Sequence, residues 1–511
     1  LTLSTKAQLC NGTLGAPIYT QTFGSGTGTG SALPAGITTY SFTSGWPTDG
    51  MYTITNTSNP PPGNPHWYTG KDHTGDPNGY MFVVNASYAP GEFFRYTVTG
   101  LCSNTTYVFS AWLANVNNFK TIQFCKDNDP PYVYANVLFK VQNSATMKID
   151  SLSTGSISPD STGMIWHQFG FTFKTGPGQS SVILSMVNNS KGGCGNDLVI
   201  DDISFRPCGP TTSITSLPSK KIYCTGDSIV LDAAIGPGYN NPVYQWQFSS
   251  NGGVNWLNIP GATSQDLILS PIALNHAGKY RLMLAENGNL NEEKCRIITE
   301  AITIKTAQSP SVDAISAPAS ICKGFSSTLS ATGANTYVWS NGTSGVNTQV
   351  TPLTTSTYTV IGMDTATGCT DKATAIVDVR TVPTAAVVAG PDSICSGNTA
   401  TLTATSPGGT YNWYTSATGG TAVYTGNPFT TPVLTATQTY YVEIVAANAC
   451  IATSRTPVKV VVNSIPVSPV IAGGDTICSG NSVTLTATAP GGTYKWYDVA
   501  TGGTPFHTGP S

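Results

Sequence analysis

A motif that recurs along the chain constrains its fold more than any other feature of the sequence. Residues 394–420 read ICSGNTATLTATSPGGTYNWYTSATGG, and residues 477–503 read ICSGNSVTLTATAPGGTYKWYDVATGG. Looser copies begin at Ile321 and at Tyr223. Each copy opens with a cysteine and continues with alternating Thr/Leu or Val/Leu, a turn and a tryptophan. Because period-2 alternation is typical of strands with one buried face, the repeats predict a tandem array of small β-domains.

The composition agrees with an all-β, multi-domain chain and argues against some partners. Only 10% of the 511 residues are charged, against about 25% in an average protein. Lys+Arg is 23 and Asp+Glu is 26, which gives a formal net charge of −3 and argues against a nucleic-acid partner. No stretch approaches the ~18 apolar residues of a membrane span. A start at Leu1 is expected after removal of a secretory signal, and equally in an excised piece of a longer chain.

The 12 cysteines follow the repeats. One cysteine opens each unit and a second comes late in each complete unit, so we expect a bridge within each of three units: Cys224–Cys295, Cys322–Cys369 and Cys395–Cys450. Cys478 would then need a partner beyond Ser511, because the last unit stops at about half length. Disulfides indicate an oxidising compartment, so we expect a secreted, cell-surface protein.

The repeats predict immunoglobulin-like packing, in which a tryptophan lies beside the bridge between the sheets. That tryptophan would be Trp246, Trp339, Trp413 and Trp496 in successive units. The pattern ICSGxxxTLTAT…GGTYxWY…TGG resembles the Ig-like and PKD-like modules found in tandem on large secreted surface proteins of Bacteroidetes. The resemblance implies export by the type IX secretion route. The expected units are 217–306 (Ig-like), 309–381 (PKD/Ig-like), 384–463 (Ig-like) and 467–511 (the N-terminal half of a further repeat).

Residues 1–209 differ from the repeats. Runs such as FFRYTVTGL, TYVFSAWLANV and WHQFGFTFKT predict long strands, and their number suggests a jelly-roll sandwich. The closing DDISF strand and the early TFGSG segment resemble carbohydrate-binding jelly rolls of secreted Bacteroidetes proteins. Five cysteines fall here, an odd number. Cys10–Cys208 and Cys125–Cys194 are the favoured pairs, with Cys102 left over, but the sequence leaves this connectivity open.

The segment KDHTGDPNGY (71–80) offers oxygen ligands at alternating positions, from Asp72, Asp76 and Asn78. Hard oxygen ligands suit Ca²⁺. In similar jelly rolls, acidic residues of the last strand complete the cage, which here implies Asp201 and Asp202. We therefore expect a structural calcium ion. The alternative is a turn whose Asx side chains bond their own backbone.

Aromatic residues of the first domain suggest a surface on which sugar rings could stack, formed by Trp46, Trp67, Tyr68, Tyr132 and Tyr134. Trp112 and Trp166 lie within apolar runs and are expected in the core. The alternative is that all of these aromatic residues are packing residues.

The sequence therefore favours an adhesin-type surface protein whose jelly roll binds a glycan or a surface or secretion-machinery protein, with the Ig-like units as a stalk. The alternatives are an accessory region of a secreted polysaccharide-degrading enzyme and a structural filament subunit. The five histidines are scattered and no HExxH or GxSxG motif occurs, so we expect no catalytic role within these residues.

Overall fold

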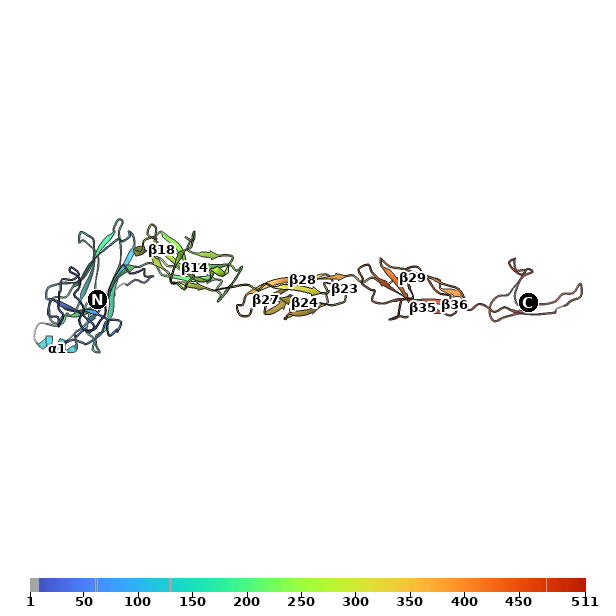
Figure 1. The fold of residues 1–511 in the computed structure, drawn as a ribbon, viewed down its shortest axis with the longest axis horizontal. Coiled ribbons are helices and arrows are strands. Elements are labelled where there is room, and N and C mark those ends of the chain that lie inside the picture. Colours follow the sequence, from blue (N-terminus) through green and yellow to red (C-terminus); the bar gives the residue numbers. More distant parts are fainter. Residues whose placement is uncertain (1–8, 60, 62, 128–130, 475) are drawn as a thin grey trace, which may run out of the picture. The chain divides into compact units, whose positions relative to one another are not determined.

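The protein is described by a computed structural model that covers residues 9–59, 61, 63–127, 131–474 and 476–511. The described chain is almost entirely β-structure, as the sequence predicted (Figure 1). It divides into two compact parts, residues 1–309 and residues 310–511. The first part contains an N-terminal sandwich and the first Ig-like unit. The second contains the second and third Ig-like units and a C-terminal segment.

The N-terminal sandwich consists of two sheets and one short helix, α1 (Phe119–Asp127). The first sheet has seven strands in the order β2-β3-β4-β11-β6-β9, with β1 also paired to β11. These strands are β1 (Tyr19–Gln21), β2 (Ser41–Phe42), β3 (Met51–Thr55), β4 (Met81–Asn85), β6 (Thr106–Asn115), β9 (His167–Lys174) and β11 (Leu198–Pro207). The second sheet has the order β5-β10-β7-β8 and comprises β5 (Glu92–Thr99), β7 (Val137–Gln142), β8 (Lys148–Ser153) and β10 (Ser181–Asn188). Two packed sheets are the architecture expected of a jelly roll.

Alternation along the strands places the core of this sandwich between its sheets. On β6, Tyr107, Phe109 and Leu113 face the second sheet and are fully buried. A smaller apolar cluster covers part of the opposite face of the seven-stranded sheet, where Val199 of β11 packs with Trp67. The outer face of the sheet is therefore partly a second core rather than solvent-exposed surface.

The first Ig-like unit follows directly. Its strands are β12 (Thr212–Leu217), β13 (Tyr223–Cys224), β14 (Ile229–Ile235), β15 (Pro242–Ser249), β16 (Leu257–Asn258), β17 (Leu267–Leu269), β18 (Gly278–Glu286), β19 (Ile297–Ile298), β20 (Ile302–Ile304) and β21 (Thr306–Ala307), with short 3₁₀ turns η1 (Leu274–His276) and η2 (Glu293–Cys295). The unit begins with β12, ahead of residue 217 where the sequence placed its start. Trp246 is fully buried at its centre. The Tyr280 hydroxyl donates to the carbonyl of His276 at 2.9 Å, the bond of a tyrosine corner.

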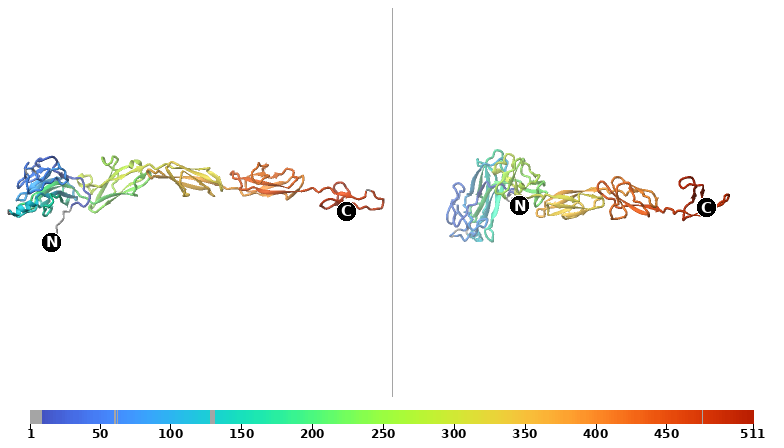
Figure 2. Two further views of the ribbon diagram at one scale, coloured as in Figure 1. Left: turned by 90° about the horizontal axis from the view of Figure 1, so that it is seen from below. Right: turned by 45° about the vertical axis from the view of Figure 1, so that its right-hand side comes forward.

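The second and third Ig-like units are separate groups of strands, as two further views show (Figure 2). The second comprises β22 (Asp313–Ala317), β23 (Ser320–Cys322), β24 (Ser327–Thr332), β25 (Thr336–Trp339), β26 (Asn347–Val350), β27 (Ser356–Met363) and β28 (Thr370–Arg380). The third comprises β29 (Val387–Ala389), β30 (Ser393–Cys395), β31 (Thr401–Thr405), β32 (Thr410–Tyr414), β33 (Tyr424–Thr425), β34 (Phe429–Thr430), β35 (Gln438–Val445) and β36 (Thr456–Asn463). Trp339 and Trp413 are buried in their respective cores, as expected.

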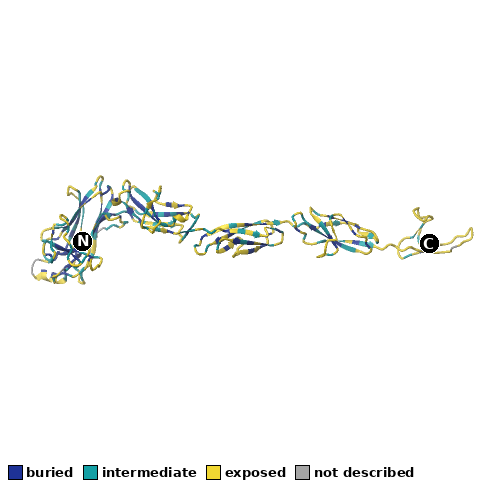
Figure 3. Ribbon diagram, viewed as in Figure 1, coloured by how far each residue is buried: buried dark blue, intermediate teal, exposed yellow. Residues whose placement is uncertain are grey.

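The C-terminal segment forms only short hairpin pairs, β37 (Val470–Ala472) with β38 (Thr486–Thr488) and β39 (Lys495–Trp496) with β40 (His507–Thr508). Nearly all of its described residues are exposed (Figure 3). Trp496 is only half-buried, in contrast to its counterparts in the complete units. The strands of this segment have no second sheet among the described residues against which they can bury a face.

The expected bridges within the Ig-like units are wrong. Cys295 bonds Cys102 of the N-terminal sandwich, and Cys322 bonds Cys450 of the third unit. The predicted pairs Cys224–Cys295, Cys322–Cys369 and Cys395–Cys450 are therefore excluded, and Cys395 and Cys478 are exposed thiols. Cys224 and Cys369 are disulfide-bonded as well. In the N-terminal sandwich, the expected bridges Cys10–Cys208 and Cys125–Cys194 are confirmed, but Cys102 is not left over, because it bonds Cys295.

The strand register explains this error. Cys322 lies opposite Arg380 at the C-terminal end of β28, whereas Cys369 comes just before the strand begins. An 11-residue strand spans roughly 36 Å at ~3.3 Å per residue, and a disulfide requires Cα atoms within about 7 Å. The two cysteines of the second unit therefore lie at its opposite ends, and Cys322 is at the end that meets the third unit.

Candidate functional site

A bulge in β11 brings the carboxylates of the adjacent residues Asp201 and Asp202 close to each other. The pairing of β11 with β6 shifts register between Asp201 and Ser204, and Asp202 adopts a φ of 42°, a left-handed conformation that is uncommon for a residue other than glycine. Asp201 is buried, whereas a third of the Asp202 side chain is exposed. Bulges of this kind commonly redirect side chains at functional sites.

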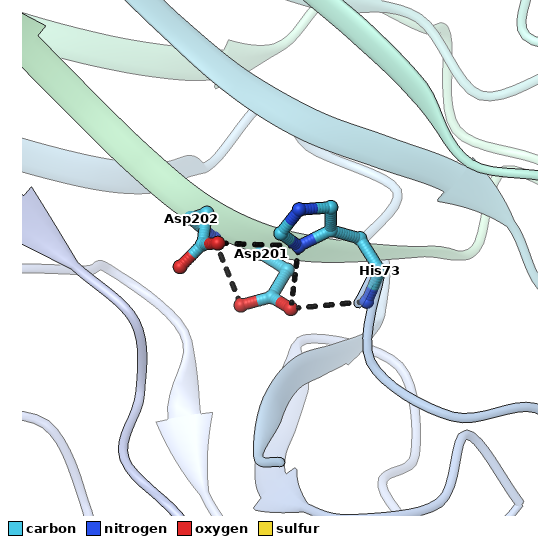
Figure 4. A group of neighbouring side chains, drawn as sticks. All are labelled: His73, Asp201 and Asp202. Atoms are coloured by element: carbon cyan, nitrogen blue, oxygen red, sulfur yellow. Dashed lines mark hydrogen bonds and ion pairs between the residues drawn. The ribbon is translucent and has the colours of Figure 1, made fainter. Parts of the chain in front are cut away.

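His73 completes a cluster with these two aspartates (Figure 4). Its Nδ1 lies 3.2 Å from Asp202 Oδ2 and 3.4 Å from Asp201 Oδ2, and its backbone N–H donates to Asp201 Oδ2 at 3.2 Å. The backbone N–H of Asp202 donates to Asp201 Oδ1 at 2.8 Å. The imidazole also stacks on Trp112, with ring centroids 4.7 Å apart. The ligand atoms of the three side chains lie within 4.8 Å of one another.

Burial and mutual repulsion both disfavour ionisation of the two aspartates. The pKa of Asp201 is raised to about 6, mainly by burial and also by the charge of Asp202, whereas the hydrogen bonds from His73 and Asp202 oppose the shift. Burial also raises the pKa of Asp202, where the charge of Asp72 acts in the same direction and that of His73 opposes it. A cation bound between the two carboxylates would offset both the burial of their charge and the repulsion between them.

The expected calcium ligands are only partly brought together. Asp72 Oδ1 accepts from the backbone of Asp76 at 2.7 Å, and Asp72 Oδ2 accepts from Thr74 Oγ1 at 2.7 Å. Asp76 Oδ1 in turn accepts from the backbone of Asn78 at 2.9 Å. These are the Asx turns of the alternative interpretation, and Asp76 and Asn78 are exposed. Of the five predicted ligands, only Asp201 and Asp202 share the cluster, and His73 was missed although it lies within the same segment.

A cavity of about 440 Å³ adjoins the cluster. Its walls include Trp112, Gln168, Asp202 and Arg206, so an aromatic ring stands beside several polar groups. The expectation that Trp112 is a core residue is wrong, because it projects from β6 on the face opposite Phe109 and is only half-buried. Trp166 packs, also half-buried, against the smaller apolar cluster.

The five aromatic residues predicted to form a stacking surface lie in two groups. Trp67 is only 4% exposed, and Trp46 packs on it with ring centroids 4.0 Å apart. Tyr132 and Tyr134 form an edge-to-face pair at 5.0 Å, in which Tyr134 is exposed and burial raises the pKa of Tyr132. The Tyr68 hydroxyl donates to the carbonyl of Asp160 at 2.9 Å. The five do not form one exposed platform, and the buried ring of Trp67 offers no free face.

Comparison with known protein families finds a match over part of the chain. The family described as "Ig-like domain CHU_C associated" matches residues 383–463 and 466–511, which is well under half of the chain. These ranges contain the third Ig-like unit and the C-terminal segment, where the sequence repeat is strongest. No curated protein matches the chain. No helix in the described ranges is long and apolar enough to cross a membrane.

Solved structures resemble the chain only distantly. A Ca²⁺-stabilised ice-binding adhesin of an Antarctic bacterium is 14% identical and covers 55% of this chain and 83% of its own, with a TM-score of 0.24. Titin domains A168–A170 are 14% identical over 49% of this chain and 98% of their own, at 0.21. The amphioxus IgVJ-C2 molecule is 13% identical over 31% of this chain and 99% of its own, at 0.16. Scores this low carry no argument about function.

Proposed function

We propose that this chain is a secreted, cell-surface protein of the adhesin type, in which the N-terminal sandwich binds a glycan and the Ig-like units act as a stalk. The contrast between the Ig-like units and the N-terminal sandwich is the main support for this proposal. The Ig-like units repeat one compact design around a buried tryptophan, whereas the N-terminal sandwich combines long loops with cavities walled by aromatic, amide and carboxylate groups. Such a combination is typical of binding sites for small polar ligands.

The disulfides support an extracellular location. Ten of the described cysteines are disulfide-bonded, many to partners far apart in sequence, and bonds of this kind persist in oxidising compartments. The bridges Cys102–Cys295 and Cys322–Cys450 fasten consecutive domains to each other. Fastened domains suit a stalk, because they resist separation at the junctions. We propose a binding role rather than a catalytic one for these residues.

Adhesion of beads coated with the whole chain tests the proposal. Beads coupled through the C-terminal end present the N-terminal sandwich and should adhere to polysaccharide gels and to glycan-coated surfaces. Beads coupled through the N-terminal end should adhere much less, because coupling blocks the proposed binding domain. Equal adhesion in both orientations, or none in either, would contradict the proposal.

We further propose that the cluster of His73, Asp201 and Asp202 holds a divalent cation in a structural role. Ca²⁺ takes six to eight oxygen ligands, and this set of two carboxylates and an imidazole does not fit it well. An imidazole nitrogen with carboxylates suits Zn²⁺ or Mn²⁺ better. Chelation should lower the melting temperature of the N-terminal sandwich, and ZnCl₂ or MnCl₂ should restore it better than CaCl₂. An unchanged melting curve after chelation would contradict the proposal, and preferential rescue by CaCl₂ would return the assignment to calcium.

A further inference from the structure

A second cavity, of about 370 Å³, opens at the end of the N-terminal sandwich where α1 lies. In Figure 1, α1 lies at the end of this sandwich away from β18 of the first Ig-like unit. The junction with that unit is at the other end, where Cys102 bonds Cys295 and the Lys294 ammonium donates to the carbonyl of Thr99. The cavity is therefore on the part of the sandwich that the first Ig-like unit does not cover.

The walls of the cavity are held by covalent and polar links between segments distant in sequence. The Cys125–Cys194 bridge ties α1 to the loop at Gly193–Gly195. The carbonyl of His66 accepts from the backbone of Asn118 at 2.8 Å and from the Thr121 hydroxyl, which ties the 64–68 loop to the start of α1. A cavity fixed in this way is largely formed before a ligand arrives, which lowers the entropic cost of binding.

Buried polar groups line this cavity. Asp197 is 9% exposed, and its two carboxylate oxygens accept from Trp67 Nε1 and from the backbone of Ala86, both at 3.1 Å. Asn117 is fully buried and donates to the carbonyl of Gly195, but its Oδ1 has no hydrogen-bond partner among the described residues. The buried Nδ1 of His66 also lacks one among them. Unpaired buried groups cost free energy, which a ligand with donor and acceptor groups would recover.

Two exposed aromatic rings stand at the cavity, and a second carboxylate lies among them. Tyr88 is 63% exposed and Phe124 is 46% exposed, so each presents ring surface to an incoming ligand. Asp49 is exposed on the same wall. A sugar ring needs an apolar face for stacking and hydroxyl partners in the same place, and this wall supplies both.

The charge of the cavity selects among sugars. Asp49 and Asp197 both line it, and no Lys or Arg side chain does so among the described residues. A glycan that carries carboxylate or sulfate groups would face the charge of Asp49, and that of Asp197 when it is ionised, without a counter-ion. A neutral sugar meets only hydrogen-bonding groups, and an ammonium substituent would gain from the carboxylates.

We propose that this cavity binds the terminal residue of a neutral or amino-substituted glycan, stacked on Tyr88 or Phe124 and hydrogen-bonded to Asp49 and Asp197. The inference rests on the proposed function and names the site and the class of sugar. Of the five aromatic residues that the sequence predicted as a stacking surface, only Trp67 lines the cavity. Its Nε1 donates a hydrogen bond that holds the Asp197 carboxylate in place.

The test uses the whole oxidised chain on an array printed with cellopentaose, N-acetylated chitopentaose, chitosan pentaose, sialyllactose and galacturonan oligosaccharides. Binding should be confined to the first three probes. Tyr88→Ala, Phe124→Ala and Asp49→Asn should each weaken it about 5- to 100-fold, because each removes one contact at the exposed rim. Tyr134→Ala is the matched control, since this ring is also exposed, at 42%, but lies outside the cavity. That variant should bind like the parent chain.

The possible outcomes separate this inference from the proposed function. Binding that all three cavity variants retain, or that only Tyr134→Ala loses, overturns the cavity assignment and leaves the adhesin proposal standing. Preference for the sialylated or galacturonan probes overturns the assigned class of sugar. A chain that binds no probe overturns the inference, and if the beads also fail to adhere, the proposed function fails with it. Circular dichroism of each variant establishes that lost binding is not lost folding.

Discussion

Asp197 is a buried carboxylate whose ionisation opposes folding. Burial raises its pKa to about 7, and the charge of Asp49 adds to the rise, while the hydrogen bonds from Ala86 and Trp67 oppose it. A carboxyl with a raised pKa in the folded state stabilises the fold most below its unfolded pKa, near 3.9. That contribution is lost as the pH rises from there through about 7, because over this interval the carboxyl ionises in the unfolded chain and stays protonated in the folded chain.

We therefore expect the melting temperature of the N-terminal sandwich to be higher at pH 5.5 than at pH 8, as followed by calorimetry. Asp49→Asn should move the loss of stability to lower pH, because it removes the neighbouring charge. In Asp197→Asn the pH dependence should shrink, because the amide that replaces this carboxyl does not ionise. A melting temperature that rises with pH over this interval in the parent chain would contradict the assignment.

Trp67 illustrates a residue whose role the sequence could not give. It stands in a turn-rich segment, PGNPHWYTG, which suggested an exposed ring. Its burial comes from contacts with Met81, Val83 and Val199, on strands that sequence periodicity cannot place beside it. We expect Trp67→Ala to cost ~3–5 kcal/mol of unfolding free energy, a typical value for a buried tryptophan, in urea titrations. Trp46→Ala should cost less, since Trp46 is half-buried, and equal costs would contradict this packing.

The cysteines provide a simple chemical test at the same scale. Of the 12, Cys395 and Cys478 are exposed thiols. Titration of the native chain with a thiol reagent should therefore give two equivalents, and maleimide labelling should locate both on these positions. The bridges first expected from the repeat would instead leave Cys395 unreactive, so its labelling distinguishes the two arrangements.

At the scale of elements, the strand register decides which cysteines meet. Cys450 lies in the turn between β35 and β36, and Cys322 lies on β23 beside the end of β28. Hydrogen bonds link the same two regions, from the Arg380 side chain to the carbonyl of Asn448 and from the Asn448 amide to the carbonyl of Thr381, both at 3.1 Å. One feature of the sequence indicated a bridge between domains, namely the odd number of cysteines in residues 1–209. One of these cysteines must either stay free or pair outside the domain, but the prediction assumed that each domain forms its own bridges.

Non-reducing peptide mapping should recover Cys102–Cys295 and Cys322–Cys450. Cys322→Ser should raise the thiol count from two to three by freeing Cys450, because the thiol of Cys395 lies beside Asn463 at the other end of β36. The near-ultraviolet spectrum should stay unchanged, since Trp339 and Trp413 lie in separate cores that the bridge does not build. A thiol count that falls to one would contradict this expectation, because Cys450 would then have paired with Cys395 and left Cys478 as the remaining thiol.

At the scale of the whole molecule, the sequence predicted the architecture better than the sites. Repeats, alternation and buried tryptophans are local patterns, so they placed Trp246, Trp339 and Trp413 correctly in their cores. The cluster of His73 with Asp201 and Asp202 depends on a bulge, and the cavity near α1 depends on a bridge and a loop contact. These features bring together residues that are far apart in the sequence, so no local pattern of residues predicts them.

Stability should also vary along the chain, because its segments differ in how many apolar residues they bury. Residues 387–463 enclose a compact cluster around Trp413, whereas in the C-terminal segment Ala487 is the one described residue that is buried and Val470 and Phe506 are largely exposed. Few buried contacts mean low free energies of local opening, and proteases cleave such segments first. Brief proteolysis of the oxidised chain should therefore remove residues after about 464 and leave the third Ig-like unit intact, as read by mass spectrometry. The trimmed chain should melt at the same temperatures and bind the same probes as the full chain. First cleavage within residues 387–463 would show instead that the repeats depend on the segment that follows them.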